Sequence, residues 1–281
     1  MSKDLKASYV DQNFKNKQQS FIRLSTLWNQ FVYKPEGHTE KTLPAVDWLS
    51  YCDKHVPHPK PDESMFTCYN ACKDIAIVMM YTAEVYDFSV YSEKSIQQYA
   101  EYQGYTLYVY RGNLDKSQHP NWSKPKALLN HINHHSHIIW MDSDTLIFNP
   151  EKKFSDIIEQ HPLKYIIACK DIGANNKKLP KGSLFNSGVL IFKNHQYIVN
   201  LIKKWRDFDC DKSSLYSDGG DQEVLCNIVY KSDPLGYNRK ILPCNAFNTD
   251  PRLINEDTFI LHFMAYPDPL KRVFMSYWHS K

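Results

Sequence analysis

Two aspartates separated by one residue follow an apolar segment of strand length, in the run Trp140-Met-Asp142-Ser-Asp144. Side chains alternate along extended backbone, so Asp142 and Asp144 are expected to point to the same side. At the carboxyl end of a strand in an open α/β sheet, they would lie where such sheets bind ligands. Two carboxylates there suit Mg²⁺ or Mn²⁺ shared with substrate phosphates. An ordinary aspartate-rich turn is the alternative, but the position at a strand end favours the metal.

Phosphatases of the haloacid-dehalogenase type also carry two aspartates at this spacing. They require a threonine or valine two residues past the second aspartate, where this chain has Leu146. They also require a later acidic residue near position 225, where Leu225 and Cys226 stand. Both requirements fail, so a metal-dependent phosphatase is kept only as an alternative. A non-catalytic sugar-binding protein is the second alternative, and it would need no complete set of metal ligands.

The elements around the aspartate pair predict an α/β fold. Apolar runs predict buried strands over residues 75–80, 106–110, 137–141, 165–169, 189–192 and 259–263. Helices are expected between the strands. One begins after an N-cap at Ser92, runs to Gln103 and is closed by Gly104. The others are expected over 124–133, after an N-cap at Asn194, and over 221–230. This alternation indicates a mostly parallel, Rossmann-like sheet flanked by helices.

The first 73 residues have a different pattern. Phe21, Leu24, Leu27, Trp28 and Phe31 recur at helical spacing, which predicts an amphipathic helix. A second short helix is expected over 45–55, before an extended linker at the prolines 57, 59 and 61. We therefore expect a helical N-terminal extension over residues 1–73 and one main domain over 74–281.

Composition excludes several classes of protein. The formal charge of +3 is the difference between 34 basic and 31 acidic residues, and no block of like charge stands out, so nucleic-acid binding is not indicated. No window approaches the roughly 20 apolar residues of a membrane span. Seven cysteines without a disulfide-scaffold spacing indicate reduced thiols. Together these features predict a cytoplasmic protein without a membrane span.

Further short motifs accompany the aspartate pair in a fixed order over residues 74–265. They are Tyr99-Ala100 with Gly104-Tyr105, Trp122-Ser-Lys124 with Ala127-Leu128, Phe185-Asn-Ser-Gly188-Val-Leu-Ile-Phe-Lys-Asn194 with Trp205, Asp221-Gln222, and Ile260-Leu-His262-Phe263. This order resembles the GT-A glycosyltransferases. The likeness is closest to the family of galactosyl-, mannosyl- and xyloglucan xylosyltransferases, and it implies a GT-A fold.

The resemblance also implies roles for particular residues. Asp142, Asp144 and His262 would bind the metal, and an imidazole beside carboxylates favours Mn²⁺ over Mg²⁺. Asp221 and Gln222 would lie beside the reacting sugar and the acceptor hydroxyl. The residues expected to bind the donor nucleotide sugar are Tyr81, Thr82, Glu84, Lys124, Asp142, Ser143, Asn186, Ser187, Gly188 and Lys271, with Arg272 an alternative to Lys271.

The implied activity is transfer of a sugar, with xylose or galactose favoured, from a UDP-sugar to a hydroxyl of an oligosaccharide or glycoprotein. An enzyme that glycosylates without a membrane anchor resembles those of bacteria and of large viruses such as the chlorella viruses. Phe274, Tyr277 and Trp278 could line the acceptor site, although core packing is the more ordinary role for such aromatic side chains.

Overall fold

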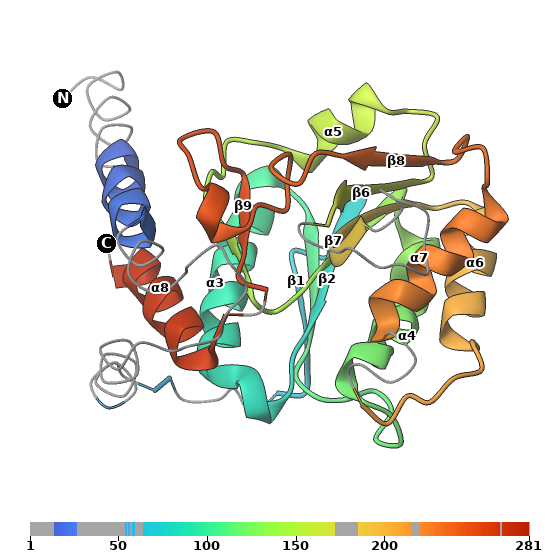
Figure 1. The fold of residues 1–281 in the computed structure, drawn as a ribbon, viewed down its shortest axis with the longest axis horizontal. Helices are drawn as coiled ribbons and strands as arrows, with labels where there is room; N and C mark the ends of the chain where they lie inside the picture. Colours follow the sequence, from blue (N-terminus) through green and yellow to red (C-terminus); the bar gives the residue numbers. More distant parts are fainter. Residues whose placement is uncertain are drawn as a thin grey trace, which may run out of the picture.

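The computed structural model describes residues 14–26, 54, 56, 58–59, 64–171, 185–214, 220–264 and 266–280. Within these residues, a central twisted sheet has helix α3 (Tyr86–Gln103) on one face and α4 (Lys124–His131), α6 (Gln196–Arg206) and α7 (Gly220–Ser232) on the other (Figure 1). Two further helices are α5 (Phe154–Gln160) and α8 (Asp268–Ser280), and residues 14–26 are also helical. This is the α/β arrangement that the sequence predicts.

The main sheet of the described residues has seven strands in the order β1-β3-β2-β4-β7-β6-β8. Strands β2, β3, β4, β6 and β8 run in one direction, whereas β1 and β7 run in the other, as the pairing of neighbours requires. The sheet is therefore mostly parallel. The strands are β1 (Phe66–Tyr69), β2 (Ile75–Met80), β3 (Thr106–Tyr110), β4 (His137–Met141), β6 (Ile166–Lys170), β7 (Phe185–Lys193) and β8 (Arg239–Leu242).

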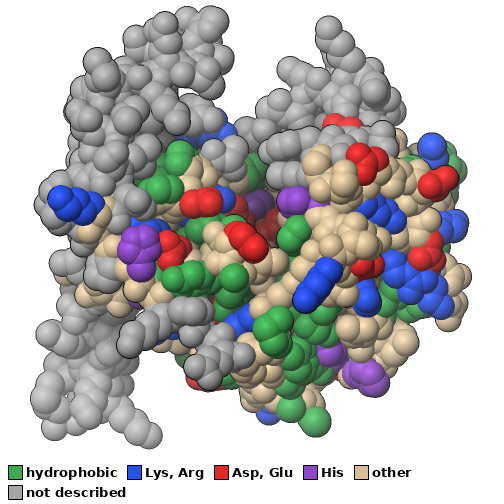
Figure 2. Space-filling model, turned by 90° about the horizontal axis from the view of Figure 1, so that it is seen from below, with side chains coloured by type: hydrophobic (Ala, Val, Ile, Leu, Met, Phe, Trp, Pro, Cys, Tyr) green, Lys and Arg blue, Asp and Glu red, His purple; other side chains and the backbone are tan. Residues whose placement is uncertain are grey.

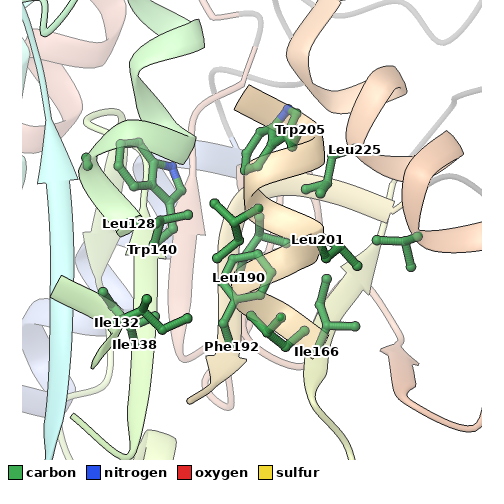
Figure 3. Close-up of a cluster of buried hydrophobic side chains, with 14 of the residues drawn as sticks. Leu128, Ile132, Ile138, Trp140, Ile166, Leu190, Phe192, Leu201, Trp205 and Leu225 are labelled. Atoms are coloured by element: carbon green, nitrogen blue, oxygen red, sulfur yellow. The ribbon is translucent and has the colours of Figure 1, made fainter. Parts of the chain in front are cut away.

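The two faces of the sheet form two hydrophobic cores, because successive side chains of a strand point in opposite directions. In β4, Ile138 and Trp140 face α4, α6 and α7, whereas Ile139 and Met141 face α3. Figure 3 shows the first of these cores, where Trp140 packs among side chains of the strands and of the covering helices. This alternation places Asp142, two residues past Trp140, toward the face that carries α4 and α7.

The predicted strands at β2, β3 and β4 are confirmed to the residue, but two helix starts were wrong. Helix α3 begins at Tyr86, and Ser92 is fully buried within it instead of capping it. Helix α6 is capped by His195, whose ring accepts a hydrogen bond from the Tyr197 backbone N–H, and Asn194 lies one residue earlier. The C-cap at Gly104 is confirmed, with a left-handed φ of 73°.

A small second sheet pairs β5 (Thr145–Ile147) with β9 (Ile260–His262) in antiparallel orientation. Beside it lies a third hydrophobic core, in which Phe21 of the 14–26 helix contacts the rings of Phe148, Phe274 and Trp278. Phe274 and Trp278 are thus buried core residues, which is the more ordinary of the two roles that the sequence allowed them. Their helical spacing on the inner face of α8 is the physical reason.

Several expectations concern segments that the structure describes only in part. The helix expected over residues 45–55 and most of the proline segment lie outside the described residues. The division into an extension over 1–73 and a domain over 74–281 stays a prediction. Two facts bear on it: β1 belongs to the main sheet, and the 14–26 helix packs into the core that it shares with α8. Short 3₁₀ turns occur at Ala83–Val85, Pro120–Ser123, Ile132–His134 and Pro251–Leu253.

Each cysteine within the described ranges is a free thiol, as the sequence predicts: Cys68, Cys72, Cys169, Cys210, Cys226 and Cys244. Cys52 lies outside these ranges. Burial raises the pKa of the Cys226 thiol to about 12, as befits a side chain packed in the core. Among the helices of the described residues, none has the length and apolar character needed to cross a lipid bilayer.

Candidate metal and nucleotide-sugar site

The aspartate pair and His262 meet because the small second sheet joins two distant parts of the chain. Thr145, directly after Asp144, pairs with His262 across the β5–β9 ladder, and the Phe263 backbone N–H donates to the Asp144 carbonyl at 2.9 Å. One ligand atom from each of Asp142, Asp144 and His262 lies within 4.8 Å of the others. Carboxylates and an imidazole converging in this way make a set that fits a divalent transition metal.

Gly188 provides the space that the His262 ring occupies. The Asp142 backbone N–H donates to the Gly188 carbonyl at 2.7 Å, which ties the start of β7 to the aspartate turn. A Cβ built on Gly188 would lie 2.1 Å from Cε1 of His262 and within 2.8 Å of both ring nitrogens. Only glycine allows the ring to lie there. The backbone at Gly188 therefore lies close to His262, and binding of the donor by Asn186, Ser187 and Gly188 stays a prediction.

The charges around Asp144 are strongly coupled. Its carboxylate lies 3.1 Å from Nε2 of His262 and 3.1 Å from Nζ of Lys271. Burial opposes ionisation of Asp144, but His262 and Lys271 outweigh that effect and hold the pKa of this carboxyl well below its usual range. Burial likewise disfavours the imidazolium of His262, yet Asp144 outweighs it and raises the pKa of the ring. Lys271 and, when it is protonated, His262 therefore both offset the charge of Asp144.

Lys124 links the aspartate pair to the start of α7. Its buried ammonium lies 3.0 Å from Oδ1 of Asp142 and 3.0 Å from Oδ2 of Asp221, and it donates to the hydroxyl of Ser187 at 3.3 Å. Burial lowers the pKa of Lys124, but the two carboxylates outweigh it and raise the pKa overall. The Trp140 indole N–H donates to Asp142 at 2.7 Å and fixes the rotation of that carboxylate.

Gln222 uses both ends of its amide to connect three elements. Its Oε1 accepts from the Ser187 backbone N–H at 2.9 Å, and its Nε2 donates to Asp171, which follows β6, at 2.7 Å. Asn186 is held in a similar manner, since its Oδ1 accepts from the Gly188 backbone N–H and from Asn248, both at 2.8 Å. The ends of β6 and β7 and the first turn of α7 are thereby joined beside the aspartates.

The predicted nucleoside-binding residues follow β2 at the same edge of the sheet. The Tyr81 hydroxyl donates to Glu93 at 2.7 Å and accepts from Arg111 at 3.0 Å, so it belongs to a separate buried network. Thr82 and the exposed Glu84 interact with each other, and the hydrogen bond from Thr82 lowers the pKa of the Glu84 carboxyl. Within the described residues, no hydrogen bond or ion pair joins these three side chains to the aspartate pair.

The remaining candidates are Ser143 and, on α8, Lys271 with its alternative Arg272. Ser143 is half-buried between the two aspartates. Lys271 reaches Asp144, whereas Arg272 is buried and pairs with Asp87 at 3.0 Å, so Lys271 is the cation of α8 that reaches the site. Sequence reasoning missed the partners that hold the site in place, namely Trp140 as a hydrogen-bond donor, Asp171 and Asn248.

The formal charges leave room for a cation. Asp142, Asp144 and Asp221 oppose Lys124 and Lys271, which leaves one net negative charge when His262 is neutral. Basic, acidic and histidine side chains gather around a hollow in the middle of the face shown in Figure 2. The Nδ1 atom of His262 is buried without a hydrogen-bond partner among the described residues. These donors fit a divalent cation bound through Nε2 and the two carboxylates, in a cradle that Gly188 keeps open.

Comparisons with known proteins agree with this geometry. A sequence model of the galactosyl transferase GMA12/MNN10 family matches residues 73–184, which contain Lys124 and the aspartate pair, whereas Asp221 and His262 lie beyond the match. A search of the curated proteins finds no match.

Solved structures with a similar fold are also glycosyltransferases. One, involved in the glycosylation of the major capsid of PBCV-1, has a TM-score of 0.58 at 13% identity and covers 73% of this chain and 99% of its own. GlyE of Streptococcus pneumoniae TIGR4 has a TM-score of 0.47 at 15% identity, with 73% and 60% covered. Fold, site and family match together define this protein as a glycosyltransferase of the GT-A fold. The predicted class is confirmed, and the resemblance lies with the galactosyl transferase GMA12/MNN10 family.

Proposed function

We propose that this glycosyltransferase is metal-dependent and moves a sugar from a UDP-sugar to a hydroxyl of a glycan acceptor, an oligosaccharide or a glycoprotein. Xylose and galactose are the favoured sugars. The observation that supports the proposal best is the convergence of Asp142, Asp144 and His262 beside two buried lysines. An anionic ligand set flanked by cations suits a diphosphate that arrives with a divalent metal.

Asp142, Asp144 and His262 would hold the cation, Mn²⁺ in preference to Mg²⁺ because one ligand is an imidazole. When bound, the cation neutralises charge on the diphosphate leaving group, which is the main electrostatic demand in breaking a sugar–phosphate bond. With a divalent cation the net charge of the site changes from one negative to one positive, which favours the anionic donor. Lys124 and Lys271 are placed to share the remaining phosphate charge.

The opposite wall of the site would hold the donor sugar and the acceptor. Asp221 is buried at the first turn of α7, where the helix N-terminus stabilises a carboxylate, and its partner Lys124 connects it to the metal ligands. We propose that Asp221 contacts the sugar or the acceptor hydroxyl. Gln222 supports this wall by fixing the backbone of Ser187, and the backbone of Asn186 and Gly188 lines it.

The loop after β2 completes the proposal. Tyr81, Thr82 and Glu84 lie past the carboxyl end of a strand that runs parallel to β4, where this fold receives a nucleoside. We propose that the backbone of Tyr81 and the side chains of Thr82 and Glu84 contact the nucleoside. The cytoplasmic setting is part of the same proposal, and free thiols are consistent with it.

The alternatives demand other geometry. A phosphatase of the aspartate-pair type needs a threonine or valine at position 146 and an acidic residue near 225, but Leu146 and Leu225 are both fully buried leucines. A sugar-binding protein without catalysis has no need for three metal ligands supported by a glycine cradle and two lysines. The arrangement therefore favours transfer over either alternative.

A thermal-shift panel of nucleotide sugars tests the proposal. UDP-xylose and UDP-galactose should each raise the melting temperature when Mn²⁺ is present and fail to do so in EDTA. The Asp144→Ala variant should show no such shift, because one metal ligand is missing. Stabilisation by GDP-mannose with UDP-sugars inert would contradict the proposed donor, and release of phosphate from simple esters without an acceptor would favour the phosphatase.

A further inference from the structure

Two loops at the edge of the sheet opposite the candidate site share a short sequence pattern. Residues 161–165 read His-Pro-Leu-Lys-Tyr and lead into β6, and residues 233–237 read Asp-Pro-Leu-Gly-Tyr and lead toward β8. Strands β6 and β8 run parallel to β4, so their starting ends lie at the edge opposite Asp142. Both loops appear at the right of the view in Figure 1, past the ends of these strands.

The leucine of each loop is held out in solvent. Leu163 is 80% exposed, Leu235 74% and Tyr237 69%, which are the highest values for large hydrophobic side chains in the part of the chain that the structure describes. Exposed apolar side chains that are scattered singly need no explanation. Here three lie on two neighbouring loops, and a local group of this kind marks an interaction surface.

Internal hydrogen bonds keep the two loops together. The Lys164 ammonium donates to the carbonyls of Gly236 and Tyr237, at 3.2 and 2.8 Å. The Asp233 carboxylate accepts from the backbone N–H groups of Tyr237 and Asn238, at 2.9 and 3.0 Å. Because their backbones are fixed in this way, the side chains of Leu163 and Leu235 project from an ordered scaffold.

The charge around these tips is positive. Between residues 159–166 and 231–240, the sequence holds Lys164, Lys231, Arg239 and Lys240 against Glu159 and Asp233. Asp233 forms an ion pair with Arg239, so its charge is compensated within the loop. Lys193 adds a further positive charge at this edge, since its ammonium donates to the Pro162 carbonyl at 2.9 Å.

We propose that these two loops form a docking surface for an anionic lipid membrane, with Leu163, Leu235 and Tyr237 entering the interface and the lysines near the headgroups. We call these three residues the loop tips. Separate apolar side chains on a positively charged rim match a lipid surface, which can accommodate projecting side chains without a complementary shape. The tyrosine suits the boundary between headgroups and acyl chains, because its ring is apolar and its hydroxyl polar. A protein partner would need a groove that matches these tips.

Docking in this manner has a consequence for the enzyme. The candidate site lies at the other edge of the sheet, so it would face the aqueous phase while the loop tips contact the lipid. The enzyme would therefore act on glycans that extend into solution near a membrane. The proposal that the loop tips dock on a membrane goes beyond the proposed function and does not depend on it.

Sedimentation with lipid vesicles tests the proposal. The full chain should sediment with vesicles of equal parts phosphatidylcholine and phosphatidylglycerol, less so at high salt, and weakly with phosphatidylcholine alone. The double variant Leu163→Ser with Leu235→Ser should bind at least about tenfold more weakly, because two aliphatic side chains no longer enter the lipid. The matched control is Leu253→Ser, which removes a leucine that is 45% exposed elsewhere and should bind like the parent chain.

The melting temperatures of both variants should equal that of the parent, so that a loss of binding cannot arise from unfolding. Absence of sedimentation by the parent chain with either vesicle would overturn the proposal, as would equal binding by the double variant. A concentration-dependent dimer that the double variant abolishes would assign the surface to a second copy of this chain instead. The assay contains no nucleotide sugar or metal, so its failure leaves the proposed transfer activity standing.

Discussion

Two buried groups of charged side chains lie close to the carboxyl edge of the sheet, and they are built differently. In the first, Arg111 is paired with both carboxylate oxygens of Glu93 and also donates to Tyr69, Tyr81 and Thr67. In the second, three carboxylates face two lysines and one histidine. The first group is balanced in charge and its hydrogen bonds lie within the group, whereas the second carries surplus negative charge when His262 is neutral.

The difference separates a structural network from a candidate site. A buried ion pair that satisfies its own donors and acceptors needs no further ligand, and its geometry serves folding. A cluster whose carboxylates outnumber its cations is stabilised by an added cation. In this cluster Gly188 also leaves the space that the His262 ring occupies. Charge balance, more than burial, identifies the site.

Loss of a metal ligand should have the largest effect on activity. We expect Asp144→Ala to reduce transfer by about a thousandfold or more, because the cation and the charge that it neutralises are lost together. The fold should persist, but the metal-free variant should melt below the metal-free parent, because Lys271 and His262 lose the carboxylate with which they pair. Circular dichroism and a transfer assay measure the two effects; retained activity would contradict the assignment.

Loss of one partner from the structural network should have the largest effect on stability. We expect Glu93→Gln to lower the free energy of unfolding by about 3–5 kcal/mol, because the Arg111 guanidinium stays buried without its counter-charge. Urea denaturation measures this effect, and the exposed Glu84→Gln should leave the unfolding midpoint unchanged. If Glu93→Gln left stability intact but abolished transfer, the roles that we assign to the two groups would be reversed.

The glycine cradle makes an intermediate prediction. In Gly188→Ala, the added methyl group would meet the His262 ring, which must move, so metal affinity should fall by about 10- to 100-fold. Gly104→Ala is the control, because φ is 73° at Gly104 but no atom lies within 4 Å of the added Cβ. This variant should lose about 1 kcal/mol of folding stability from backbone strain and should keep the metal affinity of the parent. Titration with Mn²⁺, followed by electron paramagnetic resonance, measures the metal affinity of both variants. An affinity in Gly188→Ala equal to that of the parent would show that the space at Gly188 is not needed for metal binding.

Part of the acid sensitivity should arise outside both groups, at His279. Burial lowers the pKa of His279 to about 4, and nearby Lys94 and Lys17 act in the same direction. An unfolded chain binds this proton near pH 6.5, so stability is full above that pH and is lost as the pH falls toward 4. After allowance for partial solvent access, the loss is about 1–2 kcal/mol. His279→Gln should flatten the dependence of the unfolding midpoint between pH 6.5 and 5; an unchanged slope would exclude this histidine.

The sequence could predict the parts of the fold that local patterns determine. Ile75–Met80 and His137–Met141 are uninterrupted apolar runs, and the structure makes them the buried strands β2 and β4. The aspartates follow from their place at the end of one such strand. In contrast, β1 and β8 are short and partly exposed, so neither shows an apolar run, and they were not predicted.

The rest of the candidate site depends on contacts between distant residues. The strand predicted over 259–263 is present as β9, but its partner β5 has three residues, too short to give a periodic signal. The pairing of Thr145 with His262 was therefore not predicted, and only the order of motifs assigned His262 to the metal. Trp140 was expected as a strand residue, but its indole N–H donates to Asp142, a contact that no pattern of residue types reveals. Asp171 and Asn248 act through Gln222 and Asn186, and their roles likewise require the folded chain.

Metal-dependent sugar transfer is tested most directly by following release of UDP from UDP-xylose and UDP-galactose with an oligosaccharide acceptor. The assay should be run with the parent chain and with Asp144→Ala, each in Mn²⁺ and in excess EDTA. The account predicts UDP release and a lengthened glycan only for the parent chain in Mn²⁺. Equal product from the parent chain in EDTA, or from Asp144→Ala in Mn²⁺, would contradict it.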